Sequence, residues 1–114
     1  MESQCIFCRI VAGQAPADKV YEDEHIFAFR DIHPQAPIHI LVVPKRHIAR
    51  LADLTREDAP LMGQMIYAAR KIAEHEGFVD GFRVVMNNGP GAGQSVYHVH
   101  LHLLAGRRMT WPPG

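Results

Sequence analysis

The chain has 114 residues, with 12 basic and 12 acidic side chains that balance to a net charge of zero, and eight histidines besides. Because 47% of the residues are hydrophobic and 21% are charged, the composition is that of a globular protein rather than a disordered one. The length predicts a single domain over residues 1–114. Zero charge argues against a broad basic field, so we expect neither nucleic acid nor a membrane surface as a partner.

Targeting signals and cysteine content favour the cytoplasm. The first residues, MESQCIFCRI, lack the basic and apolar stretches of a signal peptide. The longest apolar run, Ile40 to Val43, is far shorter than the roughly 20 residues that span a bilayer. Two cysteines are too few for a secreted disulfide scaffold, so we expect a reducing compartment.

In chain order, the pattern predicts a short helix followed by three strands. The helix covers Cys5–Ala12 and ends at Gly13. Alternating apolar residues predict strands at Val20–Glu22 and His25–Arg30, joined by a tight turn at Asp23 and Glu24. After a turn-rich connection with two prolines, the apolar run Ile38–Pro44 is typical of a central strand that is buried on both faces.

The next element is a long helix, predicted over Asp53–Gly77. Thr55 and Asp58 have the spacing of a capping box, Pro60 is tolerated only near the first turn, and Gly77 is a natural stop. Apolar residues at spacings of three and four predict one buried face, made of Leu61, Met62, Met65, Ile66, Ala69, Ile72 and Ala73. Strands at Phe82–Asn87 and Val99–Ala105, on either side of a glycine-rich loop, complete an α+β fold.

The strongest chemical signal is the run His98-Val-His100-Leu-His102-Leu-Leu. In a strand, alternate residues share a face, so the three imidazoles would lie about 6.6 Å apart. An amphipathic strand whose polar face happens to be histidine is the simpler interpretation, but three histidines at period two disfavour it. Clustered imidazoles supply nucleophiles, proton donors and acceptors, and metal ligands at neutral pH.

A glycine-rich loop, GPGAGQS, precedes the histidines and ends at Ser95. Such a loop is most often only a flexible connection, but its position favours an anion site in which peptide N–H groups surround a phosphate. Neither a Walker A motif nor a GxGxxG turn is present. Ser95 would lie at the junction, where its hydroxyl can give or take a proton.

Three further features have more than one interpretation. The pair Cys5 and Cys8 is half of a tetrahedral zinc site, or a pair of buried thiols, or a redox dithiol. Asp31 can accept hydrogen bonds from a ribose diol, or can simply initiate a turn before Pro34. Trp111, near the end of the sequence, indicates packing onto this chain or onto a neighbouring subunit.

Together these motifs resemble the histidine-triad (HIT) superfamily, whose signature alternates three histidines with apolar residues, and HVHLHLL matches it completely. The flanking segments DIHPQAPIHILVVPKRHI and NNGPGAGQSVYHVHLHLLAGRRMTWPPG resemble the Hint branch, and the similarity spans nearly the whole chain. The resemblance implies a five-stranded antiparallel sheet with one long and one short helix. It also implies a homodimer in which the two sheets join into ten strands.

The same resemblance implies an enzyme that hydrolyses purine nucleoside phosphoramidates to an amine and a nucleoside monophosphate. His100 would be the nucleophile that forms a nucleotidyl-histidine intermediate, His102 would bond phosphate oxygens, His39 would support the site, and Ser95 would pass a proton to the amine. Asp31 would bind the ribose. The remaining implied contacts are the base slot of Phe7, Ile10, Phe29 and Ile32, the phosphate-side residues Asn87, Gly93, Gln94 and Val96, and Trp111 from the partner subunit.

Some bacterial members of the superfamily hold zinc with two cysteines and two histidines, and Cys5, Cys8, His47 and His98 stand at the corresponding positions. We therefore expect a structural zinc and no catalytic metal. Two alternatives to the phosphoramidase remain. One is a dinucleoside polyphosphate hydrolase, which Ser95 and the Trp-Pro-Pro-Gly tail disfavour. The other is a nucleotide-binding or interaction module with little turnover.

Overall fold

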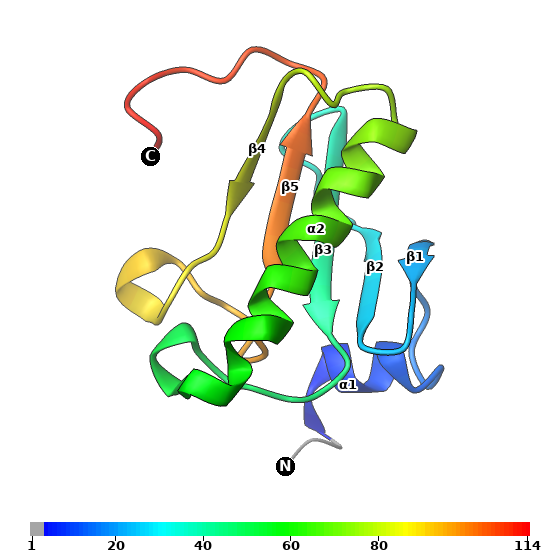
Figure 1. Ribbon diagram of the computed structural model, residues 1–114, viewed down its shortest axis with the longest axis vertical. Coiled ribbons are helices and arrows are strands. Elements are labelled where there is room, and N and C mark those ends of the chain that lie inside the picture. The colour runs from blue at the N-terminus through cyan, green and yellow to red at the C-terminus, as the bar shows by residue number, and fades with distance from the viewer. Residues whose placement is uncertain (1–3) are drawn as a thin grey trace.

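The computed structural model describes residues 4–114; the first three residues of the predicted domain 1–114 lie outside it. Five strands form one antiparallel sheet in the order β1-β2-β3-β5-β4, and the long helix α2 crosses one face (Figure 1). The predicted α+β fold is therefore confirmed. The elements are α1 (Ile6–Val11), β1 (Lys19–Glu22), β2 (Ile26–Arg30), β3 (Ile38–Pro44), α2 (Ala59–His75), β4 (Phe82–Val85) and β5 (Leu101–Ala105).

Both faces of the sheet are covered, because alternate residues of its central strands point in opposite directions. One face packs against α2 through Ile26, Ala28, Ile40, Val42, Leu101 and Leu103. On the opposite face, Phe27, Phe29, Leu41 and Val43 pack against Phe7 and Ile10 of α1. The prediction that Ile38–Pro44 is buried on both faces is thus confirmed, and the face that carries α1 is the one that builds the site.

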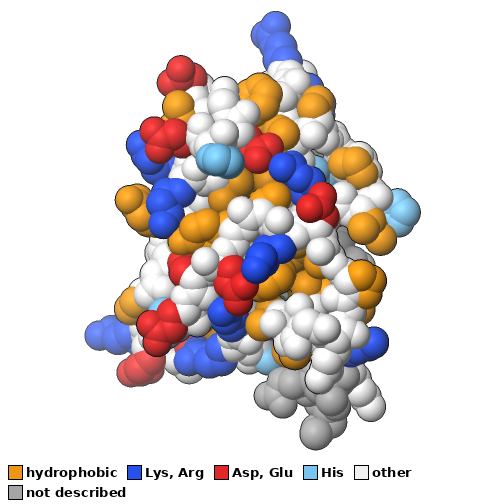
Figure 2. Space-filling view, turned by 90° about the vertical axis from the view of Figure 1, so that its right-hand side faces the viewer, with side chains coloured by type: hydrophobic (Ala, Val, Ile, Leu, Met, Phe, Trp, Pro, Cys, Tyr) orange, Lys and Arg blue, Asp and Glu red, His pale blue; other side chains and the backbone are white. Residues whose placement is uncertain are grey.

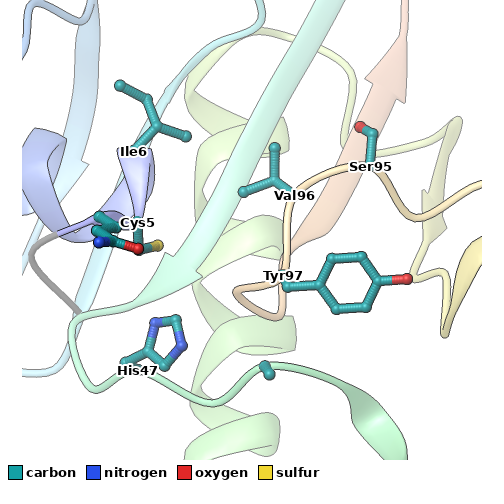
Figure 3. A pocket seen from close by; sticks show the side chains of 8 residues that line it. Cys5, Ile6, His47, Ser95, Val96 and Tyr97 are labelled. Atoms are coloured by element: carbon teal, nitrogen blue, oxygen red, sulfur yellow. The ribbon is translucent and has the colours of Figure 1, made fainter. Parts of the chain in front are cut away.

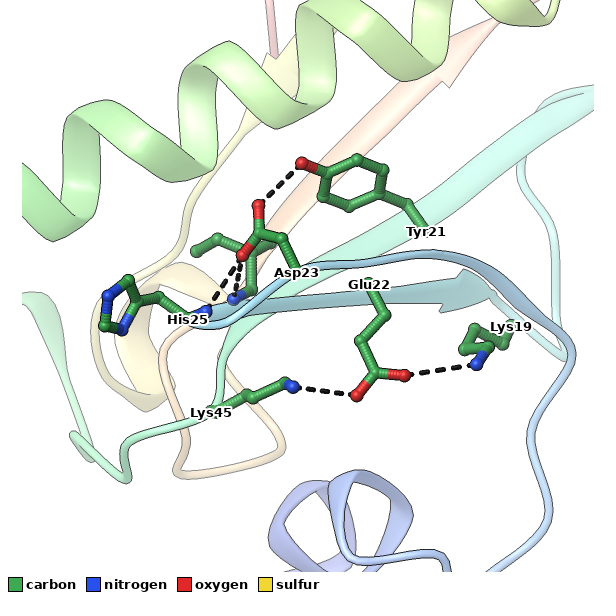
Figure 4. Close-up of polar contacts among 7 residues, drawn as sticks. Lys19, Tyr21, Glu22, Asp23, His25 and Lys45 are labelled. Atoms are coloured by element: carbon green, nitrogen blue, oxygen red, sulfur yellow. Dashed lines mark hydrogen bonds and ion pairs between the residues drawn. The ribbon is translucent and has the colours of Figure 1, made fainter.

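The hairpin between β1 and β2 is closed by Asp23 (Figure 4). Its Oδ1 atom accepts the backbone N–H groups of His25 and Ile26 at 2.9 and 2.8 Å, which is the usual way an aspartate stabilises a turn. Beside the turn, the carboxylate of Glu22 accepts a hydrogen bond from the Lys45 ammonium at 2.7 Å, which joins β1 to the end of β3. The tight turn predicted at this position is confirmed.

The long helix starts later than predicted. Two short 3₁₀ turns, η2 (Leu51–Asp53) and η3 (Arg56–Asp58), occupy the segment that was expected to begin the helix, and α2 starts at Ala59. Pro60 explains the difference, since proline has no N–H group and its ring clashes with the carbonyl four residues earlier in an α-helix. The Asp58 carboxylate does accept the Thr55 N–H at 2.8 Å, so the capping pair is present but stabilises η3.

The buried face of α2 also differs from the prediction at one position. Ile66 was expected in the core but is 55% exposed, whereas Ala68 is buried in its place. Met65, Ala69, Ile72 and Ala73 are buried as predicted, and Leu61 and Met62 pack against the core while partly exposed. Ile66 follows Met65 by about 100° around the helix, which places it outside the stripe that contacts the sheet.

The last two strands are shorter than expected. β4 ends at Val85 rather than Asn87, and β5 begins at Leu101 rather than Val99. The Val99 N–H donates to the Ile48 carbonyl at 2.7 Å, outside the sheet ladder, so the chain before Leu101 follows a different neighbour. Val99 nevertheless stays buried, as its place in the apolar alternation predicted.

Charges are well mixed over the surface seen in Figure 2, where basic and acidic side chains alternate with small apolar areas. This distribution agrees with the balance of 12 basic and 12 acidic residues. Among residues 4–114, the structure has no helix that is both long and apolar enough to cross a membrane.

Candidate active site and zinc site

A cavity of about 440 Å³ opens on the face of the sheet that carries α1, and His100 and His102 lie at its base. Leu41 of β3 pairs with His102 of β5, which places the triad strand directly beside the central strand. The cavity brings together nine of the residues predicted for catalysis and nucleotide binding: Phe7, Ile10, Phe29, Asp31, Ile32, Ser95, Val96, His100 and His102. Its walls are mostly apolar and its floor holds imidazoles, which suits a ligand with a flat apolar part and an anionic part.

The backbone fixes the protonation of His100. Its Nδ1 atom lies 2.8 Å from the carbonyl oxygen of His98, and a carbonyl can only accept, so Nδ1 carries the proton. In the neutral ring Nε2 then holds a free lone pair. Burial of the side chain lowers the pKa of His100 below its usual value, which keeps the ring neutral near pH 7. His100 therefore has the properties of a nucleophile.

A second chain of hydrogen bonds fixes His102. The Gln35 N–H donates to His39 Nδ1 at 3.0 Å, so the proton of His39 resides on Nε2. That Nε2 lies 2.9 Å from His102 Nδ1 and donates to it. The proton of His102 consequently lies on Nε2, and burial lowers the pKa of His102 to about 4. His102 is therefore a neutral hydrogen-bond donor at the floor of the cavity.

His39 and Asp31 complete this polar group. Oδ2 of Asp31 lies 3.4 Å from His39 Nε2, and the other carboxylate oxygen, Oδ1, accepts the His33 N–H at 2.8 Å. Burial lowers the pKa of His39, and the charge of Asp31 opposes that shift only in part. Asp31 thus closes a turn, as one interpretation of the sequence held, while its carboxylate lines the cavity.

The four predicted metal ligands converge at one corner of the fold, where Cys5, Cys8, His47 and His98 place their ligand atoms within 4.8 Å of one another. His98 Nδ1 lies 3.3 Å from Cys5 Sγ and 3.2 Å from His47 Nδ1, and Cys8 Sγ lies 3.3 Å from the same His47 atom. A tetrahedral zinc with ordinary bond lengths separates its donors by about 3.3–3.8 Å. The donor set fits a structural zinc site of the Cys2His2 type.

The protonation of His98 agrees with that assignment. Its Nε2 lies 2.8 Å from the Pro44 carbonyl oxygen and must donate to it, so Nδ1 is left unprotonated toward the two sulfurs and His47. A ligating histidine that donates its second N–H to a backbone carbonyl is a common arrangement in zinc sites. The sequence prediction that His98 serves the metal rather than catalysis is consistent with this geometry.

The zinc site and the cavity share two elements. Cys5 and Cys8 bracket Phe7 on α1, whose ring meets His100 edge to face at 5.1 Å between centroids. His98 supplies both a metal ligand and the carbonyl that fixes the His100 proton. Zinc bound at this tetrad would thus connect the apolar wall of the cavity to the segment before β5 that carries His100.

Comparison with known proteins agrees with this architecture, and the HIT domain family matches residues 12–109. The chain belongs to the HIT domain family. A HIT family hydrolase of Legionella pneumophila has a similar structure, with a TM-score of 0.95 and 52% identity over 97% of this chain and all of that chain. A 14 kDa zinc-binding protein of Zea mays is 49% identical over 99% of this chain and 90% of its own length. The adenylylsulfatase HINT1 of Arabidopsis thaliana is 44% identical over 99% of this chain and 78% of its own length.

Four residues that the HIT resemblance assigned to the ligand do not line the cavity. Gln94 is buried, and its amide binds the loop itself, accepting the Gly89 N–H at 2.8 Å and donating to the carbonyl oxygens of Ala49 and Val96 at 2.8 and 3.1 Å. Its position in the HIT site is thus that of a loop support. The other three are Asn87, which is half-buried after β4, and Gly93 and Trp111, which are exposed.

The glycine-rich loop of this HIT domain is more ordered than expected. Pro90–Ala92 forms a 3₁₀ turn, and Gly93 follows it with a φ of +90°, a conformation that glycine adopts without strain. The N–H groups of Gly93 and Gln94 donate to carbonyl oxygens within the loop at 3.1 and 3.0 Å. The loop contributes to the cavity through Ser95 and Val96.

Several HIT site features had no signal in the sequence. Ala15, Pro16 and Ala17, which follow α1, line the cavity, as does Leu41 of β3. Backbone groups set the protonation of His98, His100 and His39, namely the carbonyl groups of Pro44 and His98 and the N–H of Gln35. Every residue has such groups, so the sequence cannot reveal them. A second pocket of about 410 Å³ adjoins the first.

Figure 3 shows this second pocket of the HIT domain, whose lining includes Cys5 and His47 of the predicted metal site. Cys5 and His47 lie on one side of it, and Ser95, Val96 and Tyr97 lie on the facing loop. Ile6, Ser95 and Val96 line both pockets, so Ser95 stands between the histidine floor and the open groove. Ser95 is an exposed residue.

Proposed function

We propose that the chain hydrolyses purine nucleoside phosphoramidates through a nucleotidyl-histidine intermediate. The observation that carries this proposal is the pair of imidazoles at the floor of the cavity, one with a free lone pair at Nε2 of His100 and one with an N–H at Nε2 of His102. A nucleophile beside a fixed donor suits attack on phosphorus with stabilisation of the nonbridging oxygens. The membership in the HIT family supports the same chemistry.

The proposed reaction has two displacements. His100 Nε2 forms a bond to the α-phosphorus while the bond from phosphorus to the amine nitrogen breaks, and the proton that the amine needs comes from solvent through the Ser95 hydroxyl. The positive charge on the ring is stabilised by its Nδ1–H bond to the His98 carbonyl. Water then attacks phosphorus, loses a proton to solvent, and releases the nucleoside monophosphate with neutral His100.

The walls of the cavity suit the nucleoside. Phe7 and Phe29 meet edge to face at 5.4 Å, and with Ile10 and Ile32 they form a slot for a flat purine. Ile32 is 85% exposed, and contact with a base is a physical reason for such an apolar side chain at the rim. We assign the ribose hydroxyl groups to the Asp31 carboxylate. Zinc at the tetrad would hold α1 against the sheet, and no step of the reaction uses it.

We also propose a homodimer in which β4 strands pair across a ten-stranded sheet. β4 is an edge strand with the apolar Val84 40% exposed, and an unpaired edge of this kind is a template for a second strand. Trp111 is 84% exposed and lines neither pocket of its own chain. In a dimer it would reach the partner's cavity near the leaving group. Sedimentation at micromolar concentration should give twice the mass of one chain, and a monomer would contradict the dimer.

A leaving-group panel tests the proposed function. The metal-loaded protein is assayed with adenosine 5′-phosphoramidate, diadenosine tetraphosphate and adenylyl sulfate, the last because one relative is named an adenylylsulfatase. We expect the phosphoramidate to have the highest kcat/KM and a Ser95→Ala variant to lose most on the poorest leaving group. Faster cleavage of the tetraphosphate would favour the polyphosphate hydrolase. Tight AMP binding without turnover of any member would favour a binding module.

A further inference from the structure

The protonation of His39 and His102 depends on the backbone of Gln35, and the side chain of Arg107 binds that backbone. The relay of protons begins at the Gln35 N–H, which donates to His39 Nδ1 at 3.0 Å. A peptide N–H cannot become an acceptor, so as long as it stays in place the protons of both rings are confined to Nε2. The position of the Gln35 N–H therefore decides whether His102 offers a donor to the ligand.

The segment that follows β5 contacts the backbone around Gln35 at two points, the carbonyl of Gln35 itself and Pro37 two residues later. Arg107 Nε donates to the Gln35 carbonyl oxygen at 2.9 Å, and its Nη1 donates to the Arg108 carbonyl at 3.2 Å, which orients the guanidinium. Next to it, Gly106 has a φ of +92°, and a Cβ built on it would lie only 2.9 Å from Cβ of Pro37. The backbone just after β5 thus touches the connection before β3 at a position where only glycine fits.

We infer that Arg107 is a positioning residue for His102, acting through Gln35 and His39. The expected effect of Arg107 on the reaction rate rests on the proposed function. The expected effect on the protonation of His39 and His102 does not. Arg107 lies five residues after His102, just beyond the end of β5 at Ala105, and acts on the proton of His102 through Gln35 and His39. Arg107 is exposed and does not line the cavity. Its effect on His102 is therefore indirect.

Loss of the Arg107 bond removes one of the contacts that hold the Gln35 backbone, so the Gln35 N–H can move away from His39. The Nδ1 atom of His39 can then take the proton, which leaves a lone pair at its Nε2 facing Nδ1 of His102 and, at 3.4 Å, Oδ2 of Asp31. The pair relieves this repulsion when the His102 proton moves to Nδ1. In that form the Nε2 atom of His102 presents a lone pair to the phosphate oxygens instead of an N–H donor.

The test measures the protons directly. Ring nitrogen NMR spectra of the metal-loaded full chain, labelled with ¹⁵N at histidine, report which nitrogen of His39 and His102 is protonated, without any substrate. We expect the Nε2–H form for both rings in the wild type and a mixture of forms in Arg107→Met, which keeps the apolar stem but has no donor. Arg107→Lys, which can still donate to the Gln35 carbonyl, should restore the wild-type spectrum. Arg108→Met is the matched control and should leave the spectrum unchanged.

Kinetics with adenosine 5′-phosphoramidate give a second readout. We expect kcat/KM of Arg107→Met to fall about fivefold, the effect of one hydrogen bond, with Arg107→Lys close to the wild type. Unchanged ¹⁵N shifts in Arg107→Met, or equal changes in Arg108→Met, would overturn the inference even if the enzyme is active. A wild type without turnover would instead contradict the proposed function, while the NMR result would still decide the role of Arg107.

Discussion

Removal of the metal should release α1 and weaken nucleotide binding. Helix α1 has only six residues, too few to be stable alone in water. Its two buried side chains, Phe7 and Ile10, contribute about 1.5–3 kcal/mol each, so roughly 3–6 kcal/mol together. Ordering the backbone of six residues costs about 1–2 kcal/mol per residue, so roughly 6–12 kcal/mol. The two buried side chains alone therefore do not offset this cost, and zinc bound by Cys5 and Cys8 would supply much of the difference.

The perturbation is chelation of the metal, or Cys8→Ser, with Arg9→Ser on the same helix as the control. Without α1 the cavity loses Ile6, Phe7 and Ile10 from its wall. We expect the affinity for AMP to drop at least tenfold, which corresponds to about 1.4 kcal/mol. Because coupling between two sites is reciprocal, AMP should tighten zinc binding by the same factor.

Calorimetry of AMP binding to metal-loaded and metal-free protein measures the first effect, and a chelator competition with and without AMP measures the second. Amide exchange in α1, where Arg9 and Ala12 donate to the carbonyl oxygens of Cys5 and Cys8, should accelerate on metal removal. Equal AMP affinity in both forms, with the sheet intact by circular dichroism, would refute the reasoning. So would α1 amides that stay protected in the metal-free protein.

Three further predictions follow from the core and the imidazoles. Burial lowers the pKa of His100, so the ring stays neutral down to the ordinary histidine pKa near 6.5. We expect kcat/KM to be constant from pH 8 to about 6.5 and to fall only below it, where protonation removes the nucleophile. A pH–rate profile that already falls above 6.5 would contradict this. Met65→Ala, in the core, should lower the free energy of unfolding by about 2–5 kcal/mol. Ile66→Ala, at the adjacent exposed position, should change it by less than about 0.5 kcal/mol. Denaturant titrations that give similar values for both variants would be inconsistent with the packing of α2. Gln94→Ala should destabilise the protein by about 1–3 kcal/mol because it leaves the Gly89 N–H without its partner, and an unchanged midpoint of thermal unfolding would disprove the loop-support role.

The sequence predicts those parts of the molecule that depend on periodicity. Period-two alternation located the strands, since each strand residue has a fixed face, but of the three histidines only His102 lies on β5, while His98 and His100 precede it. Spacings of three and four located α2, but Ile66 shows the limit of that pattern, because a predicted stripe is wider than the contact with the sheet. The start of α2 was predicted too early because a capping pair at Thr55 and Asp58 stabilises a 3₁₀ turn as well as an α-helix.

Tertiary contacts explain what the sequence could not predict. Cys5 and Cys8 alone left three interpretations open, and only the approach of His47 and His98 decides among them. Gln94 lies in a loop expected to contact phosphate, but its amide is satisfied by three backbone groups of neighbouring segments. The proton positions on the imidazoles depend on backbone carbonyl and N–H groups, which every residue possesses, so no residue type marks them.

The central claim is that His100 attacks phosphorus and becomes covalently attached to the nucleotide. Intact mass spectrometry after acid quenching, with adenosine 5′-phosphoramidate as substrate, tests it most directly. We predict a transient increase by the mass of one adenylyl group in the wild-type protein, and no increase in His100→Ala at equal substrate and time. Turnover in the wild type with no adduct at any time point, or the same adduct in His100→Ala, would contradict the account.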